Sequence, residues 1–253
     1  MTQPSSNASS QYPQLENAPI VEALLDIQVQ LPEGKSIDEL HAVFDKIKDM
    51  FPIEKKRYQF SSSIEFKPLE KVTNQGLSTS HTDGYLFHSE NKTKVFQARL
   101  DGFTFNKHKP YENWAVLKKE AQGLWDIYKD VAEPVSIKRL ALRFINKIPL
   151  KTPFDPSNYF RTLPSLAPDL DYGIFNLFSQ ISIKNKKLDA VANITEALEA
   201  ADSEFVHFVF DIDTFKFGDF KETDIWNLFD ELRDFKNEIF FKSLTPATLK
   251  LLG

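Results

Sequence analysis

The chain has 253 residues, a formal net charge of −5 and no cysteine. The lack of cysteine excludes disulfides, thiolate zinc sites, iron–sulfur clusters and cysteine nucleophiles. The negative charge gives no general attraction to nucleic acid or to an anionic membrane, and no glycine-rich phosphate loop occurs among only 8 glycines. The 23 phenylalanines predict a core built largely of rings, a composition that favours strands.

The chain opens with a polar stretch and then a strand and a helix. Residues 1–18 are rich in Ser, Gln, Asn and Pro, so we expect a disordered tail without a secretory signal. Apolar and polar residues alternate over 20–31, which predicts a half-buried strand. Ser36 and Glu39 then have the spacing of a capping box, which predicts the start of a helix.

Three further strands and a long helix are predicted in the first half of the chain. The strands cover 57–66, 85–89 and 94–105, and the polar residues 67–80 are expected to form an exposed loop. Apolar residues recur at helical spacing over 111–128. This part of the chain therefore has the element order β-α-β-β-β-α.

The second half repeats most of that order. A strand is predicted over 136–148, followed by a loop at 152–168 that holds four prolines. Strands are predicted over 174–184, 189–197 and 204–217. A helix over 224–241, capped by Thr223, and a short tail over 243–253 complete the chain.

Residue spacing also indicates an internal duplication. The stretch 100–105 matches 212–217 at an offset of 112, and Trp114 falls on Trp226 at the same offset. The opening strands of the two halves match at an offset of 117, and loops absorb such differences. We therefore expect an α+β fold of two similar β-α-β-β-β-α halves that form antiparallel sheets with long helices packed on one face. The halves are 19–134 and 135–253.

Successive side chains of a strand point to opposite faces of the sheet, and the charged residues of these strands share the face opposite the apolar one. If the opening strands pair antiparallel across a two-fold axis, Asp26 meets Arg139 and Glu22 meets Arg143. Such cross-strand pairs fix the register of a sheet. The alternative is an anion-binding floor, because arginine holds carboxylate or phosphate with two hydrogen bonds.

These alternatives define the candidate ligand site. For an anionic ligand, Arg99, Arg139 and Arg143 would provide the charge, and Asn146 would orient the ligand. Asp211 and Asp213 resemble half of a magnesium site, but further carboxylates would have to converge on the metal, and a structural role at the strand end is the stronger expectation. The sequence assigns neither catalytic residues nor a cofactor. Apart from this pair, it offers no candidate metal ligands.

A basic segment suggests a third use. Residues 92–119 carry seven basic and two acidic residues, interleaved with aromatic rings, a composition that suits single-stranded nucleic acid. No known nucleic-acid-binding signature is present, and the whole chain is acidic. Nucleic acid is therefore the weaker expectation for a partner.

The strand Arg139-Leu-Ala-Leu-Arg143-Phe-Ile-Asn146-Lys-Ile resembles the RLxLRyiNxI strand of a sporadically distributed prokaryotic family of unknown function. Other similar stretches are Ala18–Ala23, Phe96–Asn106, Tyr111-x-x-Trp114 and Phe210–Asp213. The patchy distribution of that family suits an accessory protein of a defence or regulatory system. The element order also resembles duplicated gyrase-inhibitor-like effector-binding modules, which bind small molecules between their halves.

These observations together predict a cytoplasmic, non-enzymatic binding or interaction protein. Its expected partner is a small anionic ligand or a protein, with a homodimer among the options and no membrane association. A metal-dependent hydrolase or nuclease that uses Asp211 and Asp213 is the alternative from another class.

Overall fold

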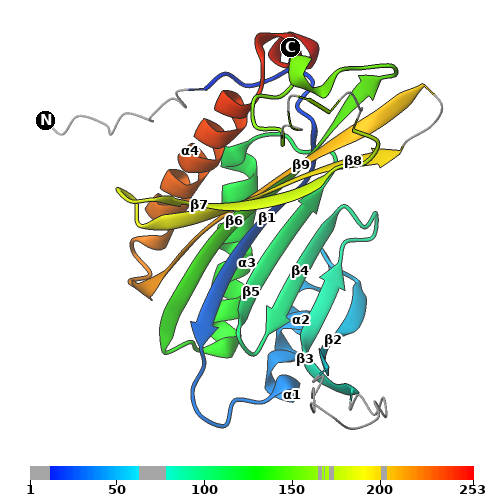
Figure 1. The fold of residues 1–253 in the computed structure, drawn as a ribbon. Helices are drawn as coiled ribbons and strands as arrows, with labels where there is room; N and C mark the ends of the chain where they lie inside the picture. The colour runs from blue at the N-terminus through cyan, green and yellow to red at the C-terminus, as the bar shows by residue number, and fades with distance from the viewer. Residues whose placement is uncertain (1–11, 63–77, 165–166, 168, 171–173, 201–203) are drawn as a thin grey trace, which may run out of the picture.

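The computed structural model describes residues 12–62, 78–164, 167, 169–170, 174–200 and 204–253. They form an α+β fold built on one antiparallel sheet (Figure 1). The strands are β1 (Ile20–Gln30), β2 (Ile53–Ser62), β3 (Ser78–His88), β4 (Lys94–Arg99), β5 (Gly102–His108), β6 (Ser136–Lys151), β7 (Phe178–Asn185), β8 (Ala190–Ala200) and β9 (Phe205–Phe220). The helices are α1 (Ile37–Leu40), α2 (Ala42–Ile47), α3 (Trp114–Ala132), α4 (Ile225–Ser243) and α5 (Pro246–Leu252), with a 3₁₀ turn η1 (Pro156–Asn158).

The strand order is β2-β3-β4-β5-β1-β6-β9-β8-β7. The predicted α+β class and the antiparallel pairing are confirmed. The expected antiparallel sheets are joined into one, because β1 of the first half and β6 of the second pair directly at the centre. Leu25 lies opposite Leu142 in that pair, so the strands of both halves continue into one sheet.

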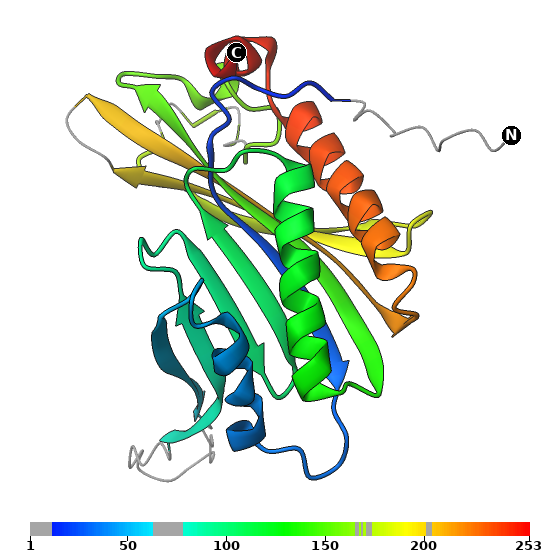
Figure 2. The ribbon, with the colours of Figure 1, turned by 180° about the vertical axis from the view of Figure 1, so that it is seen from behind.

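Helices α3 and α4 lie against the same face of the sheet (Figure 2). Asn113 begins α3 by accepting a hydrogen bond from the Val116 N–H, which satisfies one of the free donors at the helix start. The apolar side of α3 and that of α4 then cover alternate strand residues such as Ile27 and Phe144, which are almost fully buried. The core therefore fills the space between the helices and the sheet, and none of the described helices covers the other face of the sheet.

The predicted single strand over 94–105 is wrong. It is a hairpin of β4 and β5 that turns at Leu100 and Asp101. Gly102 has a φ of 156°, and a side chain there would collide with the carbonyl oxygen of Ile27. The dipeptide Asp101–Gly102 is a general turn signal, so a break in the predicted strand could have been expected at this point.

Two helix ends test the predicted caps. The capping box of Ser36 and Glu39 is confirmed at the start of α1. The predicted Thr223 cap is wrong: Asp224 is the N-cap of α4 and makes no side-chain capping bond, and Thr223 donates its hydroxyl hydrogen to the Asp224 carboxylate. The predicted tail over 243–253 is also wrong, because Pro246 begins α5.

Residues 12–18 of the predicted disordered tail lie along the body of the protein, so the prediction is wrong for this part, and residues 1–11 lie outside the described residues. Leu15 packs against the core, and the ring of Tyr12 stacks on Phe241 with centroids 4.9 Å apart. The Asn17 N–H donates to the carbonyl oxygen of Leu252 at 2.9 Å. Figure 2 shows this segment crossing the adjacent ends of α3 and α4.

The register of the sheet differs from the predicted alignment of the two halves. Ile27 pairs with Phe103 and Phe144 pairs with Ile212, so β5 and β9 correspond at an offset of 109 (212 minus 103). The predicted offset of 112 places the buried Phe103 on Phe215, which lies on the opposite face of the sheet beneath Arg139. The predicted match at 212–217 is therefore three residues out of register.

Candidate functional site

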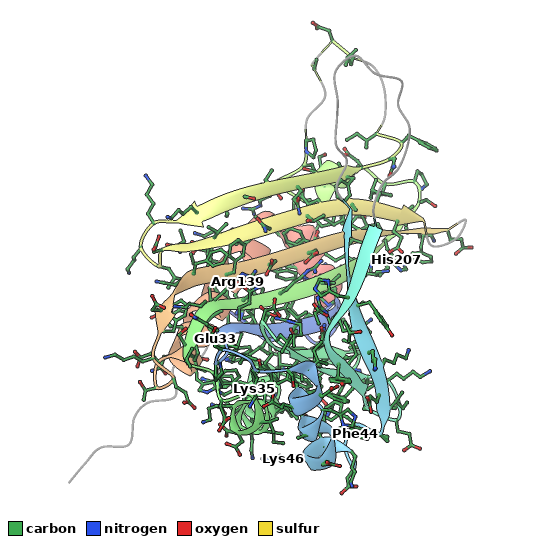
Figure 3. All side chains as sticks on the ribbon, turned by 90° about the horizontal axis from the view of Figure 1, so that it is seen from below. Glu33, Lys35, Phe44, Lys46, Arg139 and His207 are labelled. Atoms are coloured by element: carbon green, nitrogen blue, oxygen red, sulfur yellow. The ribbon has the colours of Figure 1, made fainter. Side chains whose placement is uncertain are left out.

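The helix-free face of the sheet carries a continuous set of polar side chains. Figure 3 places Arg139 on this strand layer, apart from Phe44 and Lys46, which belong to α2. The set begins on β4, crosses the central strands and ends on β7. Its members include Gln97, Arg99, Thr104, Asn106, Glu22, Asp26, Arg139, Arg143, Asp211, Asp213, Asn193 and Gln180.

Asp26 lies at the centre of this face and is only 8% exposed. Its carboxylate binds Arg99 at 2.8 Å and Arg139 at 3.1 Å, and it accepts a hydrogen bond from Thr104 at 2.7 Å. Burial alone lowers the pKa of Arg99, but Asp26 and Asp101 outweigh it and hold this pKa above its ordinary value. The predicted pair of Asp26 and Arg139 is confirmed, together with the antiparallel pairing of β1 and β6.

The second predicted pair, Glu22 with Arg143, is wrong. Arg143 binds Asp211 on β9 with two nitrogens, and its Nε lies 2.9 Å from Oδ1. Glu22 instead accepts a hydrogen bond from Asn106 at 2.6 Å. Strand β6 pairs with β1 on one side and with β9 on the other. Asp211 of β9 binds Arg143 directly, whereas Glu22 of β1 does not.

All three predicted arginines are thus neutralised within the sheet. Arg99, Arg139 and Arg143 face four carboxylates, those of Asp26, Asp101, Asp211 and Asp213. An anion on this surface would compete with these built-in partners. The face is organised as an ion-pair network that fixes the register of the central strands.

The predicted metal ligands belong to the same network. Asp211 holds Arg143, and Asp213 lies 3.8 Å from Arg139. Burial raises the pKa of the Asp213 carboxyl, and the nearby arginines reduce that shift. Within the part of the chain that the structure describes, no group of three or more His, Cys, Asp or Glu could hold a metal ion.

The predicted basic segment does not form one exposed patch. Lys107 is 2% exposed and binds Glu112 at 2.6 Å and Glu120 at 3.4 Å. Phe103 and Phe105, the rings expected to stack on bases, are fully buried in the core. The structure therefore separates the charges from the rings on which the nucleic-acid hypothesis depended.

Asn146, the fourth candidate, is separated from the three arginines. It lies on the helix-covered face of β6, in the same alternation as Phe144, and is 2% exposed. Its side-chain amide donates to the carbonyl oxygen of Phe210 at 2.9 Å. With Phe144 it forms part of the wall of a cavity on that face.

This cavity has a volume of about 760 Å³, within the usual range for a small-molecule site. Its walls are residues 12–20, the segment 109–115 that leads into α3, and the part of α4 over 233–241. We call it the α3–α4 cavity. Its aromatic lining consists of Tyr12, Tyr111, Trp114, Phe144, Phe240 and Phe241.

Lys236 is the unusual residue of the α3–α4 cavity. It projects from α4, is 8% exposed, and its Nζ lies 4.1 Å from the centre of the Phe144 ring. Among the described residues, neither a carboxylate nor a hydrogen-bond acceptor contacts this amine. Burial lowers the pKa of Lys236 to about 7, and the nearby Arg233 contributes to the shift.

Other groups around the cavity also favour a negatively charged ligand. Arg233 lies one helical turn before Lys236, holds Asp234 at 2.6 Å and lies 5.8 Å from the Trp114 ring centre. The first turn of α3 borders the cavity and carries no acidic residue, although Glu112 lies just before the N-cap Asn113. Burial raises the pKa of the Tyr111 hydroxyl above its usual range, so this group remains a neutral hydrogen-bond donor.

Sequence reasoning missed Lys236, although a signal exists. The predicted apolar side of the last helix includes Phe229, Leu232 and Ile239. Lys236 is four residues after Leu232 and three before Ile239, so it lies on that apolar side. A lone lysine within an apolar helical stripe predicts a buried amine, and the cavity itself depends on segments that only the folded chain brings together.

The comparisons with known proteins give no further guide. No family model matches the chain, and no curated protein matches it. Within the described residues, no helix is long and apolar enough to cross a membrane.

Proposed function

We propose that this chain is a non-enzymatic, cytoplasmic binding protein for a small organic carboxylate with an apolar body, held in the α3–α4 cavity. The observation that carries the proposal is Lys236, a buried amine that lines the cavity and has no anionic partner among the residues that the structure describes. The absence of cysteine fits the reducing cytoplasm. The anionic ligand expected from the sequence is retained, and its site moves from the arginines to the opposite face of the sheet.

The charges around the cavity support a carboxylate. Burying an amine without a counter-ion is costly, and a ligand carboxylate would supply the missing charge. Lys236, Arg233 and Lys109 are the cations of the lining, and Glu16 and Glu112 are its acids. Glu112 is already bound by Lys107, and that hydrogen bond lowers its pKa. Arg233 is likewise held by Asp234. Among the described lining residues this leaves Lys236 and Lys109 against Glu16, so an anion enters a site with a small excess of positive charge.

The rings of the lining support an apolar, planar ligand body. Tyr111 and Phe144 meet edge to face with centroids 5.5 Å apart, and Tyr12 stacks on Phe241. Such faces pack well against an aromatic or flat aliphatic group. A phenyl group joined to a short carboxylate matches both features, and 3-phenylpropanoate is a suitable probe.

Titration of 3-phenylpropanoate by isothermal calorimetry near neutral pH tests the proposal. We expect the wild type to bind and Lys236→Met to bind at least about tenfold more weakly, because charged hydrogen bonds contribute roughly 1.5–3 kcal/mol. Absence of binding to the wild type, or equal affinity in the variant, would contradict the proposal.

Two control variants separate the cavity from other cationic surfaces. Lys242→Met removes an exposed lysine later on the same helix, which pairs only with Glu238 among the described residues, and should leave the affinity unchanged. The double variant Arg139→Met with Arg143→Met should also keep the affinity, although it removes charges from the sheet network. Loss of binding in the double variant alone would return the anion site to the sheet face.

We further propose that the chain arose by internal duplication, despite the shifted register of β5 and β9. The mirrored strand order around β1 and β6 supports this, as does the pairing of Leu25 with Leu142, its own counterpart at an offset of 117. At the helix offset of 112, Lys236 corresponds to Leu124, which is 5% exposed. The position that Leu124 occupies in the core of the first half would then hold the ligand-binding Lys236 in the second half.

A further inference from the structure

We infer that the ligand is a 2-oxo acid, an acid with a ketone carbonyl next to its carboxylate, and that Lys236 captures it as a reversible imine in the α3–α4 cavity. This inference rests on the proposed function and names the class of ligand more closely. It adds covalent capture by a specific lysine to simple binding of an anion.

The first support is the position of the amine. Nζ of Lys236 lies over the ring of Phe144, within a cavity wall, and is not tied to any acceptor among the described residues. A lysine used only for stability would be paired or would extend its amine into water. This amine is instead held in an apolar wall and faces space that a ligand carbon can enter.

The second support is a separate cation for the carboxylate. Arg233 lines the same cavity three residues earlier on α4, and residues at this spacing lie side by side on a helix. The Nε and Nη2 groups of Arg233 donate to Asp234, so the remaining N–H groups of the guanidinium would hold a ligand carboxylate. When the carbon next to that carboxylate is a carbonyl, Arg233 keeps the acid group and Lys236 faces the electrophilic carbon.

The protonation state of Lys236 suits this chemistry. Burial lowers its pKa to about 7, Arg233 lowers it and Asp234 raises it, so about half of the amine is uncharged at neutral pH. An uncharged amine in an apolar pocket is the form of lysine that attacks carbonyl carbons. The other ionisable groups in the lining are Tyr12, Glu16, Lys109, Tyr111 and Glu112.

The reaction needs no oxidant or reductant. The lone pair of Nζ forms a carbon–nitrogen bond to the carbonyl carbon, and the carbonyl π electrons move to oxygen to give a carbinolamine. The two hydrogens of the uncharged amine leave with that oxygen as water, and a carbon–nitrogen double bond remains. Addition of water reverses each step, so the ligand is released unchanged.

Trapping with sodium cyanoborohydride tests the inference on the full-length protein. Incubation with phenylpyruvate and the reductant should increase the intact mass once, by the mass of the probe minus one oxygen atom. Peptide mapping should place this adduct on Lys236. The analogue 3-phenylpropanoate, which lacks the ketone, should bind in calorimetry and leave no adduct.

Lys236→Arg is the matched variant because it keeps a positive charge and removes the nucleophilic amine. We expect it to bind 3-phenylpropanoate and to form no adduct with phenylpyruvate. Adduct formation on another lysine, or none in a wild type that binds 3-phenylpropanoate, would overturn the imine and leave the proposed function standing. If the wild type binds neither probe, both proposals fail. Mapping in the wild type decides the matter even if the variant does not fold.

Discussion

Replacing Lys236 with methionine should raise the free energy of unfolding near pH 7 by about 3–5 kcal/mol. Burial holds the pKa of this lysine at about 7 in the folded protein, against the ordinary lysine value of 10.5. The lowered pKa means that the buried lysine destabilises the folded state relative to the unfolded state at pH 7. Each pKa unit of this difference corresponds to about 1.4 kcal/mol. Methionine has a similar shape and fills the same apolar wall without a charge.

The pH dependence of stability provides the sharper form of this prediction. Because the folded-state pKa is lowered, the unfolded chain binds more protons between pH 7 and 10.5, and wild-type stability should rise with pH across this window. Between about pH 7 and 9.5 the rise from Lys236 alone is about 3 kcal/mol. Tyr111 and Tyr128, whose pKa values burial raises, begin to lower stability only above this range.

Urea unfolding of the wild type and Lys236→Met at several pH values measures both effects. The difference between the two proteins should be largest near pH 7 and shrink as the pH rises. Parallel profiles would mean that Lys236 is fully charged in the folded protein, and a less stable variant at pH 7 would mean that the amine has a stabilising partner. Lys242→Met serves as the control, because this exposed lysine should not change the profile.

Replacing Asp26 with asparagine should be the most damaging single change on the open sheet face. Asparagine keeps the shape of the side chain but leaves the buried Arg99 and the half-buried Arg139 without their shared charge. Removing one partner of a buried ion pair costs about 3–5 kcal/mol. Asp101 remains beside Arg99 and Asp213 beside Arg139, so we expect a loss near the lower end of that range.

Chemical denaturation of Asp26→Asn at neutral pH checks this expectation. The matched control is Asp189→Asn, which breaks an exposed pair with Lys184 and should leave the unfolding midpoint unchanged. An Asp26→Asn protein as stable as the wild type would show that the ion-pair network does not stabilise the sheet. The same variant should still bind 3-phenylpropanoate, because Asp26 lies on the face away from the cavity.

The central strands show how far the sequence alone could predict the fold. Strand alternation, the match of the opening strands at an offset of 117 and an assumed two-fold axis together predicted that β1 and β6 pair antiparallel and that Asp26 meets Arg139. They could not show that β9 would lie on the other side of β6 and take Arg143. The partner of a strand residue depends on the strand order, which involves contacts between distant parts of the chain.

The candidate site was harder to predict for the same reason. Asn146 was grouped with Arg139 and Arg143 by their closeness in sequence, but the alternation of β6 places it on the opposite face. Applying parity to Asn146 would have separated it from the arginines. The α3–α4 cavity could not be predicted, because residues 12–20 and 109–115 become its walls only when the fold brings both segments together with α4.

A direct measurement of the Lys236 amine tests the central claim that this residue is the ligand-binding group of a buried site. Lysine labelled with ¹³C at Cε reports its own titration by NMR, and the Lys236 signal is the one missing from Lys236→Met. We expect a midpoint near 7 in the free protein, and a midpoint at least about one pH unit higher with saturating 3-phenylpropanoate, because the carboxylate favours the charged amine. A midpoint near the ordinary lysine value, or one that the probe does not move, would contradict the account.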